Sequence, residues 1–250
     1  MKTSAKIAPQ SEIFFFNENN FLAVARKLFR KDALRVLRSR IAEKAPAIVE
    51  QTDDKKNAAA LELGIAPDQL RLHREWYDIW MTADISMLRK YAAAYDQIVY
   101  PPQIRTVREK KAFVAWHQDD AYMRALGARA HKKIITCFVP LDDEPGNRPT
   151  VQFFINPGQT SITHTELPGA VMNKFDIAEK DKPPAEQCVS YKLNLGDAFI
   201  FGKLVLHRTY FEQDAFPSRQ SMEFRLTTKD SLIGGKDYYD LKTHTFYLKE

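Results

Sequence analysis

Apolar residues in the first part of the chain follow a helical spacing. Leu34, Leu37 and Ile41 lie three and four positions apart, which places them on one face of an amphipathic helix. Asp32 precedes this stripe and is a residue type that caps helix starts. Further expected elements are helices over 67–80 and 84–95, a strand over 21–25, and a loop or short helix over the polar, alanine-rich residues 50–64.

The pattern changes after Pro101-Pro102, where we expect the helical part to end. Short runs of β-branched and aromatic residues follow, separated by Gly, Pro, Asp and Asn, as is typical of an all-β sandwich or barrel. These runs cover residues 104–107, 112–116, 134–140, 151–155, 187–193, 198–201 and 222–227. The predicted fold class is therefore mainly β with flanking helices, built on a double-stranded β-helix core of the jelly-roll or cupin-like type.

The pattern predicts a single domain over residues 1–250. The chain contains no internal repeat, no low-complexity run and no Gly/Ser linker, and β domains of this length commonly form one core. We expect a mostly helical front section, residues 1–100, to pack on a β-helix core formed by residues 101–230. The sequence does not determine the oligomeric state.

Charge narrows the class of partner. The net charge is +5, and the 37 Lys and Arg residues are spread along the chain with one local excess between Arg26 and Arg40. A nucleic-acid-binding protein would gather them on one face or in a tail, so no nucleic-acid partner is expected. The basic helix is also compatible with peripheral contact at a membrane surface, although packing on a sheet is the simpler interpretation.

Cysteine content and the start of the chain indicate a cytoplasmic protein. Cys137 and Cys188 are the two cysteines of the sequence, too few for a disulfide framework. The first residues lack the charged, apolar and small-residue segments of a signal peptide, and no run approaches about 18 apolar residues. We therefore expect no transmembrane segment.

Two histidines and an aspartate form a candidate metal site. His117 and Asp119 lie two positions apart after an apolar run, and alternate residues of an extended backbone point to the same face. His207 follows another apolar run, far enough along for intervening strands to return beside the first. Two imidazoles and one carboxylate on one face of an octahedral ion leave three open positions, which suits oxygen-activating Fe(II). A His-x-Asp pair also arises by chance, so ordinary buried histidines are the alternative.

An arginine after the second histidine adds a candidate anion site. Arg219 lies twelve positions after His207 (219 − 207), where the next strand would point back into the core. Its planar fork can grip a carboxylate with two hydrogen bonds. Thr209 and Ser221 each lie two positions from one of these residues and offer hydroxyl groups to the same carboxylate.

Alternatives exist for these residues. Arg219 can instead form a surface ion pair with Glu223 or Asp214, and Arg225 is the alternative anchor, less favoured by its spacing. Trp116 is expected either to line the metal site or to pack in the core.

These segments resemble the phytanoyl-CoA dioxygenase family of Fe(II)/2-oxoglutarate oxygenases. The resemblance covers nearly the whole chain and is most specific over residues 113–120 and 195–226. The similar positions are the run Trp-His-Gln-Asp ending at Asp119, the pair Gly196-Asp197 before an apolar run, the distal His207, the trailing Arg219, and the opening strand with the helix from Asp32.

The resemblance implies an activity and a site. It implies that His117, Asp119 and His207 bind Fe(II) and that Arg219 anchors the co-substrate 2-oxoglutarate. It also implies that O₂ and a small-molecule substrate bind, that a C–H bond is hydroxylated or desaturated, and that succinate and CO₂ are released. The carboxylate at position 119 argues against halogenation, because a halide would need that ligand position to be open.

The chain departs from the family at two places. Many members carry Pro-Gly-Ser-His where this chain reads Pro-Gly-Gln-Thr over residues 157–160. The Gly-Ser that often follows the distal histidine is replaced here by Arg208-Thr209. Neither change touches an expected ligand. Both fall where the pocket wall is expected, so they bear on the substrate and not on the reaction type.

Basic residues ahead of the metal motif favour an anionic substrate. They are Arg105, Arg108, Lys110 and Lys111. An acidic sugar, an amino or other carboxylic acid, or a CoA thioester would fit, whereas a solvated basic face is the plain alternative. The sequence does not name the substrate or the residues that line its pocket.

Two other classes of function are compatible with the pattern. A cupin-like metal-dependent isomerase or hydrolase would use the same three ligands but would need neither Arg219 nor 2-oxoglutarate. A non-catalytic β-barrel binding module would keep the fold without needing the ligand set.

Overall fold

The computed structural model describes residues 13–50, 74–107, 113–127, 132–142, 151–167, 175–210, 219–233 and 237–248. Within these ranges, all paired strands are antiparallel and form sheets of eight, three and two strands. The large sheet has the order β1-β2-β9-β4-β11-β3-β12-β13, the second sheet β10-β5-β8, and the third β6-β7.

The strands of the large sheet come from both ends of the chain. They are β1 (Ile13–Asn17), β2 (Asn20–Ala25), β3 (Gln97–Val107), β4 (Ile135–Pro140), β9 (Ala198–Gly202), β11 (Arg219–Thr227), β12 (Tyr238–Asp240) and β13 (Thr245–Tyr247). The smaller sheets contain β5 (Val151–Phe154), β8 (Cys188–Ser190), β10 (Leu206–Thr209), β6 (His164–Glu166) and β7 (Phe175–Ile177).

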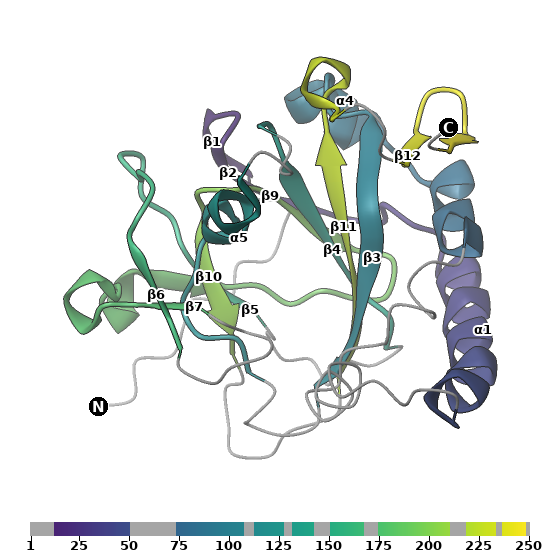
Figure 1. Ribbon diagram of the computed structural model, residues 1–250, viewed down its shortest axis with the longest axis horizontal. Coiled ribbons are helices and arrows are strands. Elements are labelled where there is room, and N and C mark those ends of the chain that lie inside the picture. Colours follow the sequence, from purple (N-terminus) through teal and green to yellow (C-terminus); the bar gives the residue numbers. More distant parts are fainter. Residues whose placement is uncertain are drawn as a thin grey trace.

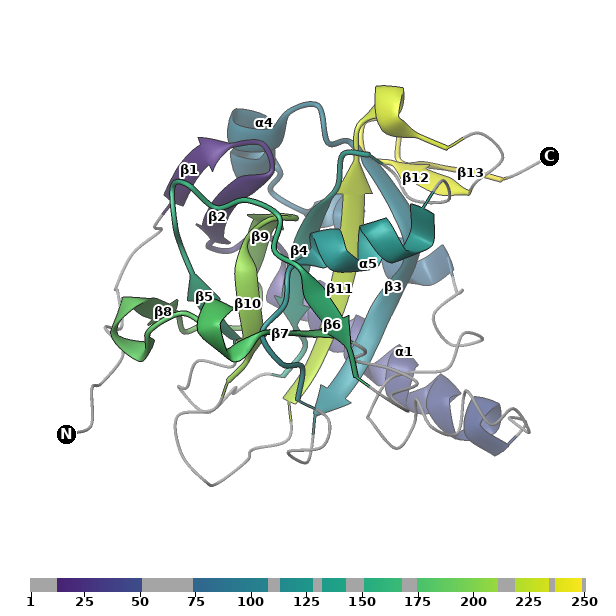
Figure 2. The same ribbon diagram turned by 60° about the vertical axis from the view of Figure 1, so that its left-hand side comes forward.

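Helices are fewer and mostly short. The α-helices are α1 (Lys31–Glu50), α4 (Ser86–Ala92) and α5 (Asp119–Leu126), and the 3₁₀ helices are η1 (Arg74–Thr82), η4 (Glu179–Asp181), η5 (Ala185–Gln187) and η6 (Lys229–Ser231). In Figure 1, α1 lies on one side of the large sheet and the smaller sheets lie on the other. Figure 2 shows α5 crossing in front of β4, β11 and β3. Among the described helices, none is long and apolar enough to cross a membrane.

The helix-covered face of the large sheet forms the main apolar core. Alternate residues of β4 and β11, such as Cys137 and Phe224, are fully buried there against Leu34 of α1. The apolar stripe predicted for this helix is confirmed, because Leu37 and Ile41 are also buried in the same cluster. Trp80 of η1 packs edge-on against Phe224, with ring centroids 5.3 Å apart.

The other face of the large sheet lines the interior between the sheets. Phe199 of β9 points to this side and contacts both Phe138 of β4 and Phe153 of β5 in a second apolar cluster. The two faces alternate along each strand, as the two-residue period of an extended backbone requires. The predicted jelly-roll type of core with flanking helices is therefore confirmed.

Gly196 and Asp197 connect the opening of the chain to β9. Gly196 has a φ of +98°, and a Cβ atom at this position would lie 2.7 Å from the carbonyl oxygen of Phe29. Asp197 accepts hydrogen bonds from the Arg26 side chain and from the backbone N–H of Lys27. The Gly-Asp pair seen in the sequence thus holds the turn after β2 against the start of β9.

The structure corrects several predicted boundaries. Pro101-Pro102 does not end a helical section but lies inside the long strand β3. The helix expected over 84–95 is shorter, and the described part of the one expected over 67–80 is 3₁₀ helix. The front section is not only a helical cover, because β1 and β2 belong to the large sheet. Residues 50–64, apart from the last residue of α1, and residues 108, 110 and 111 lie outside the described residues.

Candidate metal centre

The two predicted histidine ligands are joined through their backbones. His117 forms an isolated antiparallel bridge with His207 of β10, and each backbone N–H donates to the other residue's carbonyl at 3.0 Å. Opposed residues in an antiparallel pair place their side chains on the same side of the ladder. The imidazole centroids are accordingly 4.1 Å apart. The fold itself therefore brings together two residues that are 90 positions apart (207 − 117).

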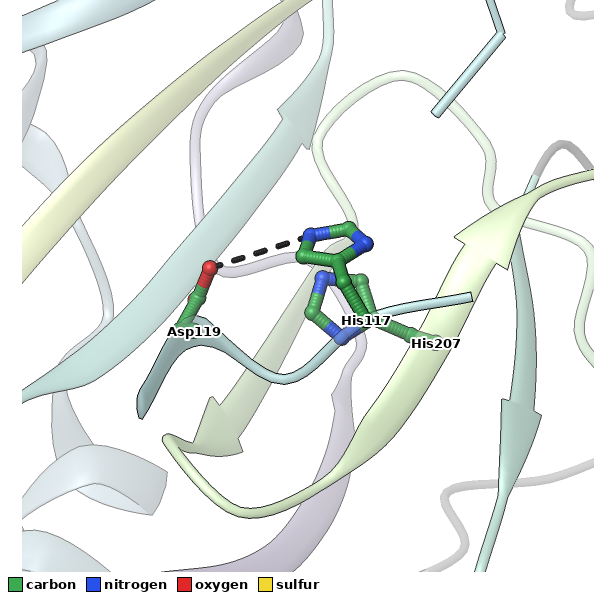
Figure 3. Close-up of side chains that lie close together, drawn as sticks. All are labelled: His117, Asp119 and His207. Atoms are coloured by element: carbon green, nitrogen blue, oxygen red, sulfur yellow. Dashed lines mark ion pairs between the residues drawn. The ribbon is translucent and has the colours of Figure 1, made fainter. Parts of the chain in front are cut away.

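Asp119 reaches the same point from the first turn of α5. Gln118 is extended, with φ −112° and ψ 141°, and the helix begins at Asp119. The Asp119 Oδ1 atom lies 4.0 Å from His117 Nε2, as the dashed line in Figure 3 indicates. One ligand atom from each of His117, Asp119 and His207 lies within 4.8 Å of the others, and all three residues are buried. This spacing allows one ion to contact all three.

Both histidines present Nε2 toward the ion position. His117 Nδ1 lies 2.9 Å from the carbonyl oxygen of Ala115, and His207 Nδ1 lies 3.0 Å from that of Val205. A carbonyl only accepts, so each Nδ1 carries the proton and each Nε2 keeps its lone pair. Burial, followed by the nearby His207, holds the pKa of His117 well below its usual range. His117 is therefore neutral at physiological pH, as metal binding requires.

Each oxygen of the Asp119 carboxylate has a polar side-chain partner. Oδ2 accepts the hydroxyl of Thr136 on β4, and Oδ1 lies 3.3 Å from Nη2 of Arg225 on β11. Burial opposes ionisation of Asp119, but the positive charge of Arg225 acts against it, and the pKa of the carboxyl lies well below its usual range. Asp119 is therefore an anion that could bind a metal ion. The sequence pattern did not predict that Thr136 would contact Asp119.

Gln118 points away from the metal position and locks the surrounding loops. Its side-chain N–H groups donate to the carbonyl oxygens of Thr160 and Leu204, each at 2.8 Å, and its oxygen accepts the N–H of Ile162. Its backbone N–H donates to Nε2 of His164 at 3.0 Å. The middle residue of the His-Gln-Asp run thus fixes the loop that bears both ligands. No sequence signal marked this function.

Aromatic rings surround the two histidines. Tyr122 of α5 packs edge-on against His117 with centroids 5.6 Å apart, while Phe201 and Phe153 contact His207 at 4.7 and 6.1 Å. Trp116 packs instead in a separate apolar cluster with Leu206, and the Arg208 guanidinium lies 4.7 Å from its ring centroid. Of the two interpretations of Trp116, the structure favours core packing.

The predicted anchor Arg219 lies inside the fold. It is 3% exposed and starts β11, whose odd-numbered residues face the interior. Arg219 is therefore not a surface residue, and Asp214, one of its two suggested partners, lies outside the described residues. Ser221, on the same face, is fully buried, and its hydroxyl has no hydrogen-bond partner among the described residues.

A second buried arginine, Arg105, adjoins this position. It is the cross-strand partner of Ser221 on β3 and is 3% exposed. Burial, and then the neighbouring charge of Arg105, lower the pKa of Arg219 to about 10, so Arg219 still carries its charge at neutral pH. Two adjacent buried guanidinium groups favour an anion beside them. Arg105 was noted in the sequence as one of several basic residues, without this position.

The Arg219 side chain leans along β11 toward the metal ligands. Its guanidinium carbon lies 5.3 Å from the ring centroid of Phe138, which pairs with Glu223 four positions along the strand (223 − 219). Thr136, the residue that grips Asp119, lies two positions from Phe138 on the same face of β4. Two residues of strand correspond to roughly 7 Å. Arg219, Phe138 and Thr136 thus contribute to the same face of the large sheet.

Thr209 and Arg225 occupy other places. Thr209 lies on β10 in the smaller sheet, and its hydroxyl accepts the backbone N–H of Val114 at 3.1 Å. Its predicted contact with a co-substrate stays a prediction. Arg225, the alternative anchor, bonds to Asp119 and also to Glu223 at 3.3 Å. The structure therefore places Arg225 at the metal ligand and Arg219 farther along the same strand face.

Comparison with known proteins adds a fold relationship. No family model matches the chain, and a search of curated proteins returns no significant match. Among solved structures, the chain is similar to the apo form of the non-heme monooxygenase ThoJ, with a TM-score of 0.58 and 14% identity over 93% of this chain and 85% of ThoJ.

Two further structures come from nogalamycin biosynthesis. The epimerase SnoN, solved in complex with Fe3+, alpha ketoglutarate and nogalamycin RO, gives a TM-score of 0.55 and 14% identity over 84% of this chain and 80% of SnoN. The non-heme alpha ketoglutarate dependent carbocyclase SnoK gives 0.52 and 12% over 94% and 90%. The chain therefore has the fold of these non-haem enzymes, in agreement with the resemblance seen in its motifs.

Proposed function

We propose that this protein is an Fe(II)- and 2-oxoglutarate-dependent oxygenase. The observation that carries the proposal is the buried set of His117, Asp119 and His207, whose ligand atoms lie within 4.8 Å of one another. The set consists of two imidazoles and one carboxylate, which is the donor set of iron oxygenases that keep open coordination positions. The fold shared with ThoJ, SnoN and SnoK supports the same interpretation.

The residues fit both the ion and its co-substrate. We propose that the far carboxylate of 2-oxoglutarate binds Arg219, with Ser221 and Arg105 beside it, while its 2-oxo acid end meets the metal. The charge of two guanidiniums suits a carboxylate, and the buried Ser221 hydroxyl offers a donor that the described residues do not use. Thr209 is proposed as a further hydroxyl contact.

The chain itself supplies orientation and a dry surrounding. With iron and 2-oxoglutarate bound, O₂ chemistry at this site would oxidise a substrate C–H bond and release succinate and CO₂. The residues hold the ligands in place: Ala115 and Val205 fix the imidazole tautomers, and Thr136 with Arg225 fixes the carboxylate. Tyr122 and the phenylalanines around His207 exclude water from this region.

The oxidation that we propose is hydroxylation or desaturation of a small anionic metabolite. The ligand Asp119 is present, so no coordination position is vacated for a halide. The net charge of +5 supports an anionic group on the substrate. Salt shortens the screening length from about 10 Å at 0.1 M to about 3 Å at 1 M and so weakens the attraction between the protein and an anionic substrate. With 2-oxoglutarate kept saturating, the kcat/KM for the primary substrate should therefore fall with rising ionic strength, while kcat hardly changes. A neutral primary substrate would contradict the proposal that the substrate is anionic.

Anaerobic titration tests the proposal directly. Addition of Fe(II) and then 2-oxoglutarate should produce a weak charge-transfer band in the visible, with one ion per chain. Screening of carboxylates, acidic sugars and CoA thioesters should then find a compound that stimulates succinate release. A metal-dependent isomerase or hydrolase would turn over without 2-oxoglutarate and O₂, and a binding module would bind no metal. Either result would replace the oxygenase proposal.

A further inference from the structure

We propose that Thr136 and Arg225 make Asp119 a one-oxygen ligand and thereby keep three coordination positions open. Thr136 and Arg225 are positioning residues in this proposal, because they act through Asp119. The inference rests on the proposed oxygenase function and extends it, since it assigns a task to a pair of side chains that only the structure brings together. The supporting observations are the contacts of the two carboxylate oxygens, the strand register beneath them, and their burial.

The two carboxylate oxygens have different surroundings. Oδ1 faces the histidines, 4.0 Å from His117 Nε2, and is also 3.3 Å from Arg225 Nη2. Oδ2 accepts the hydroxyl of Thr136. Asp119 is 2% exposed and Thr136 is 1% exposed, so water does not compete for Oδ2. The geometry identifies Oδ1 as the metal ligand and Oδ2 as the oxygen that is held away from the ion.

The register of the large sheet fixes this grip. Arg225 of β11 and Thr136 of β4 are direct cross-strand partners, and both side chains face the interior. Neighbouring side chains on one face of a pair lie about 4.5–5.5 Å apart at Cβ, which is a suitable spacing to hold the two oxygens of one carboxylate. Glu223, two residues before Arg225, lies 3.3 Å from the guanidinium and restrains it. The grip therefore belongs to the sheet and does not depend on a bound ion.

The proposed oxygenase reaction requires that Asp119 bind the metal through one oxygen only. An octahedral ion with three protein ligands has three remaining positions, two for a chelating 2-oxo acid and one for O₂. A carboxylate can bind an ion through one oxygen or through both. If Asp119 bound through both, it would occupy one of the three positions, and the co-substrate and O₂ could no longer bind together. A hydroxyl on Oδ2 prevents this without removing the ligand.

Water relaxation of the Mn(II)-loaded protein tests the inference without turnover. Mn(II) in the parent protein should hold three exchanging waters, and 2-oxoglutarate should displace two of them. In Thr136→Val, which loses the hydroxyl at similar size, the ion should hold two waters, and the Kd for 2-oxoglutarate should rise roughly 10- to 100-fold. Thr136→Ser, which keeps the hydroxyl, should restore both values. Thr136→Ala gives the same test with less steric demand if the valine variant does not fold.

A matched control separates this effect from general loss of packing. Thr227 is fully buried on the same strand as Arg225, and its hydroxyl donates to the carbonyl of Lys133. Thr227→Val should lower the unfolding temperature without changing the number of waters on Mn(II). Arg225→Lys should weaken Mn(II) binding roughly 10- to 100-fold, because a single ammonium replaces the guanidinium that contacts both Asp119 Oδ1 and Glu223.

The outcomes are distinct. Three waters and unchanged 2-oxoglutarate affinity in folded Thr136→Val or Thr136→Ala would overturn the inference while leaving the oxygenase proposal intact. Complete loss of Mn(II) in a folded Thr136 variant would also overturn it, since Thr136 would then govern whether the ion binds and not how Asp119 binds it. If the parent protein bound no Mn(II), or if 2-oxoglutarate displaced no water, the proposed function itself would fail.

Discussion

The two faces of β11 are both buried and carry opposite chemistry. On the helix side, Met222, Phe224 and Leu226 are apolar and fully buried. On the interior side, Arg219 is 3% exposed and Ser221 is fully buried, yet both are polar. Burial alone therefore does not distinguish the core of this protein from its candidate site. The core and the candidate site differ in the chemical groups that surround each buried side chain.

The difference shows how one strand serves stability and binding at once. Apolar burial on the helix side contributes roughly 25 cal/mol for each Å² removed from water. Buried charges on the interior side are unfavourable unless they meet a partner. A strand that keeps arginines inside must therefore place polar or charged partners around them, as Asp119 and Glu223 do for Arg225. If this division holds, substitutions on the two faces should affect different measurements.

The largest expected effect is loss of metal binding on the interior side. His207→Ala removes one of three ligand atoms while the backbone bridge to His117 remains, so binding of Fe(II) or Mn(II) should fall below detection by calorimetry. The metal-free protein should keep its circular dichroism spectrum. His244→Ala, at an exposed histidine outside the site, is the matched control and should bind as the parent does. Parental metal affinity in His207→Ala would remove this residue from the ligand set.

The next effect lies on the helix side. Phe224→Ala should lower the free energy of unfolding by about 3–5 kcal/mol, because it leaves a cavity between Trp80 and Tyr77. Urea unfolding measures this change. The Kd of the folded protein for Mn(II) should stay within a factor of a few of the parent value. If metal affinity fell in proportion to the free energy of unfolding, the two faces of β11 would not serve separate functions.

A smaller effect is expected for the anchor on the interior side. Arg219→Ala should raise the Kd for 2-oxoglutarate by roughly one to three orders of magnitude, because it removes a charge-assisted contact worth about 1.5–4 kcal/mol in a buried site. Arg35→Ala, at an exposed arginine of α1, removes the same charge and should have no effect. A strong effect of Arg225→Ala with none from Arg219→Ala, measured at saturating metal, would move the anchor to Arg225.

Arg105→Ala should act in the same direction but more weakly. Arg105 pairs with Ser221 and lies near Arg219, so we expect a rise of about tenfold in the 2-oxoglutarate Kd, equal to about 1.4 kcal/mol. If this variant raised the KM of the primary substrate and left 2-oxoglutarate unaffected, Arg105 would bind the substrate's anionic group instead.

The smallest effect concerns pH and the metal-free protein. Burial lowers the pKa of both His117 and His164 in the fold. Below the ordinary histidine pKa of about 6.5, the histidines of the unfolded chain take up protons, whereas the buried histidines of the folded chain do not. Protonation therefore favours the unfolded state, and the free energy of unfolding falls as pH falls below about 6.5. Unfolding free energies measured from pH 7.5 to 5 should therefore decrease, and less steeply in His164→Gln. A stability independent of pH in this range would contradict the expected direction.

The clustering of His117, Asp119 and His207 was predictable because its signals are local. Two residues that flank Gln118 in an extended run, and a histidine after a second apolar run, are visible in the sequence alone. The helix that begins at Asp119 was missed, since its eight residues show no clear helical period beside the motif. The pair Pro101-Pro102 was misread as a boundary, although β3 continues through it.

The grip on Asp119 was not predictable, because it depends on strand register. Nothing local shows that Thr136 is the cross-strand partner of Arg225, or that Arg105 faces Ser221. These pairings follow from how β11 fits between β4 and β3. Spacing in the sequence ranked Arg219 above Arg225 as the anchor, and the structure adds a separate reason, since Arg225 already contacts the ligand carboxylate.

The bridge between His117 and His207 has an evolutionary consequence. Its two hydrogen bonds join main-chain atoms only, so any residue type other than proline can take part at either position. A lineage can therefore exchange one imidazole for another side chain and still close the same ninety-residue segment. Descendants of such a scaffold can gain, alter or lose a metal chemistry through single substitutions, while the architecture that displays those side chains is inherited unchanged.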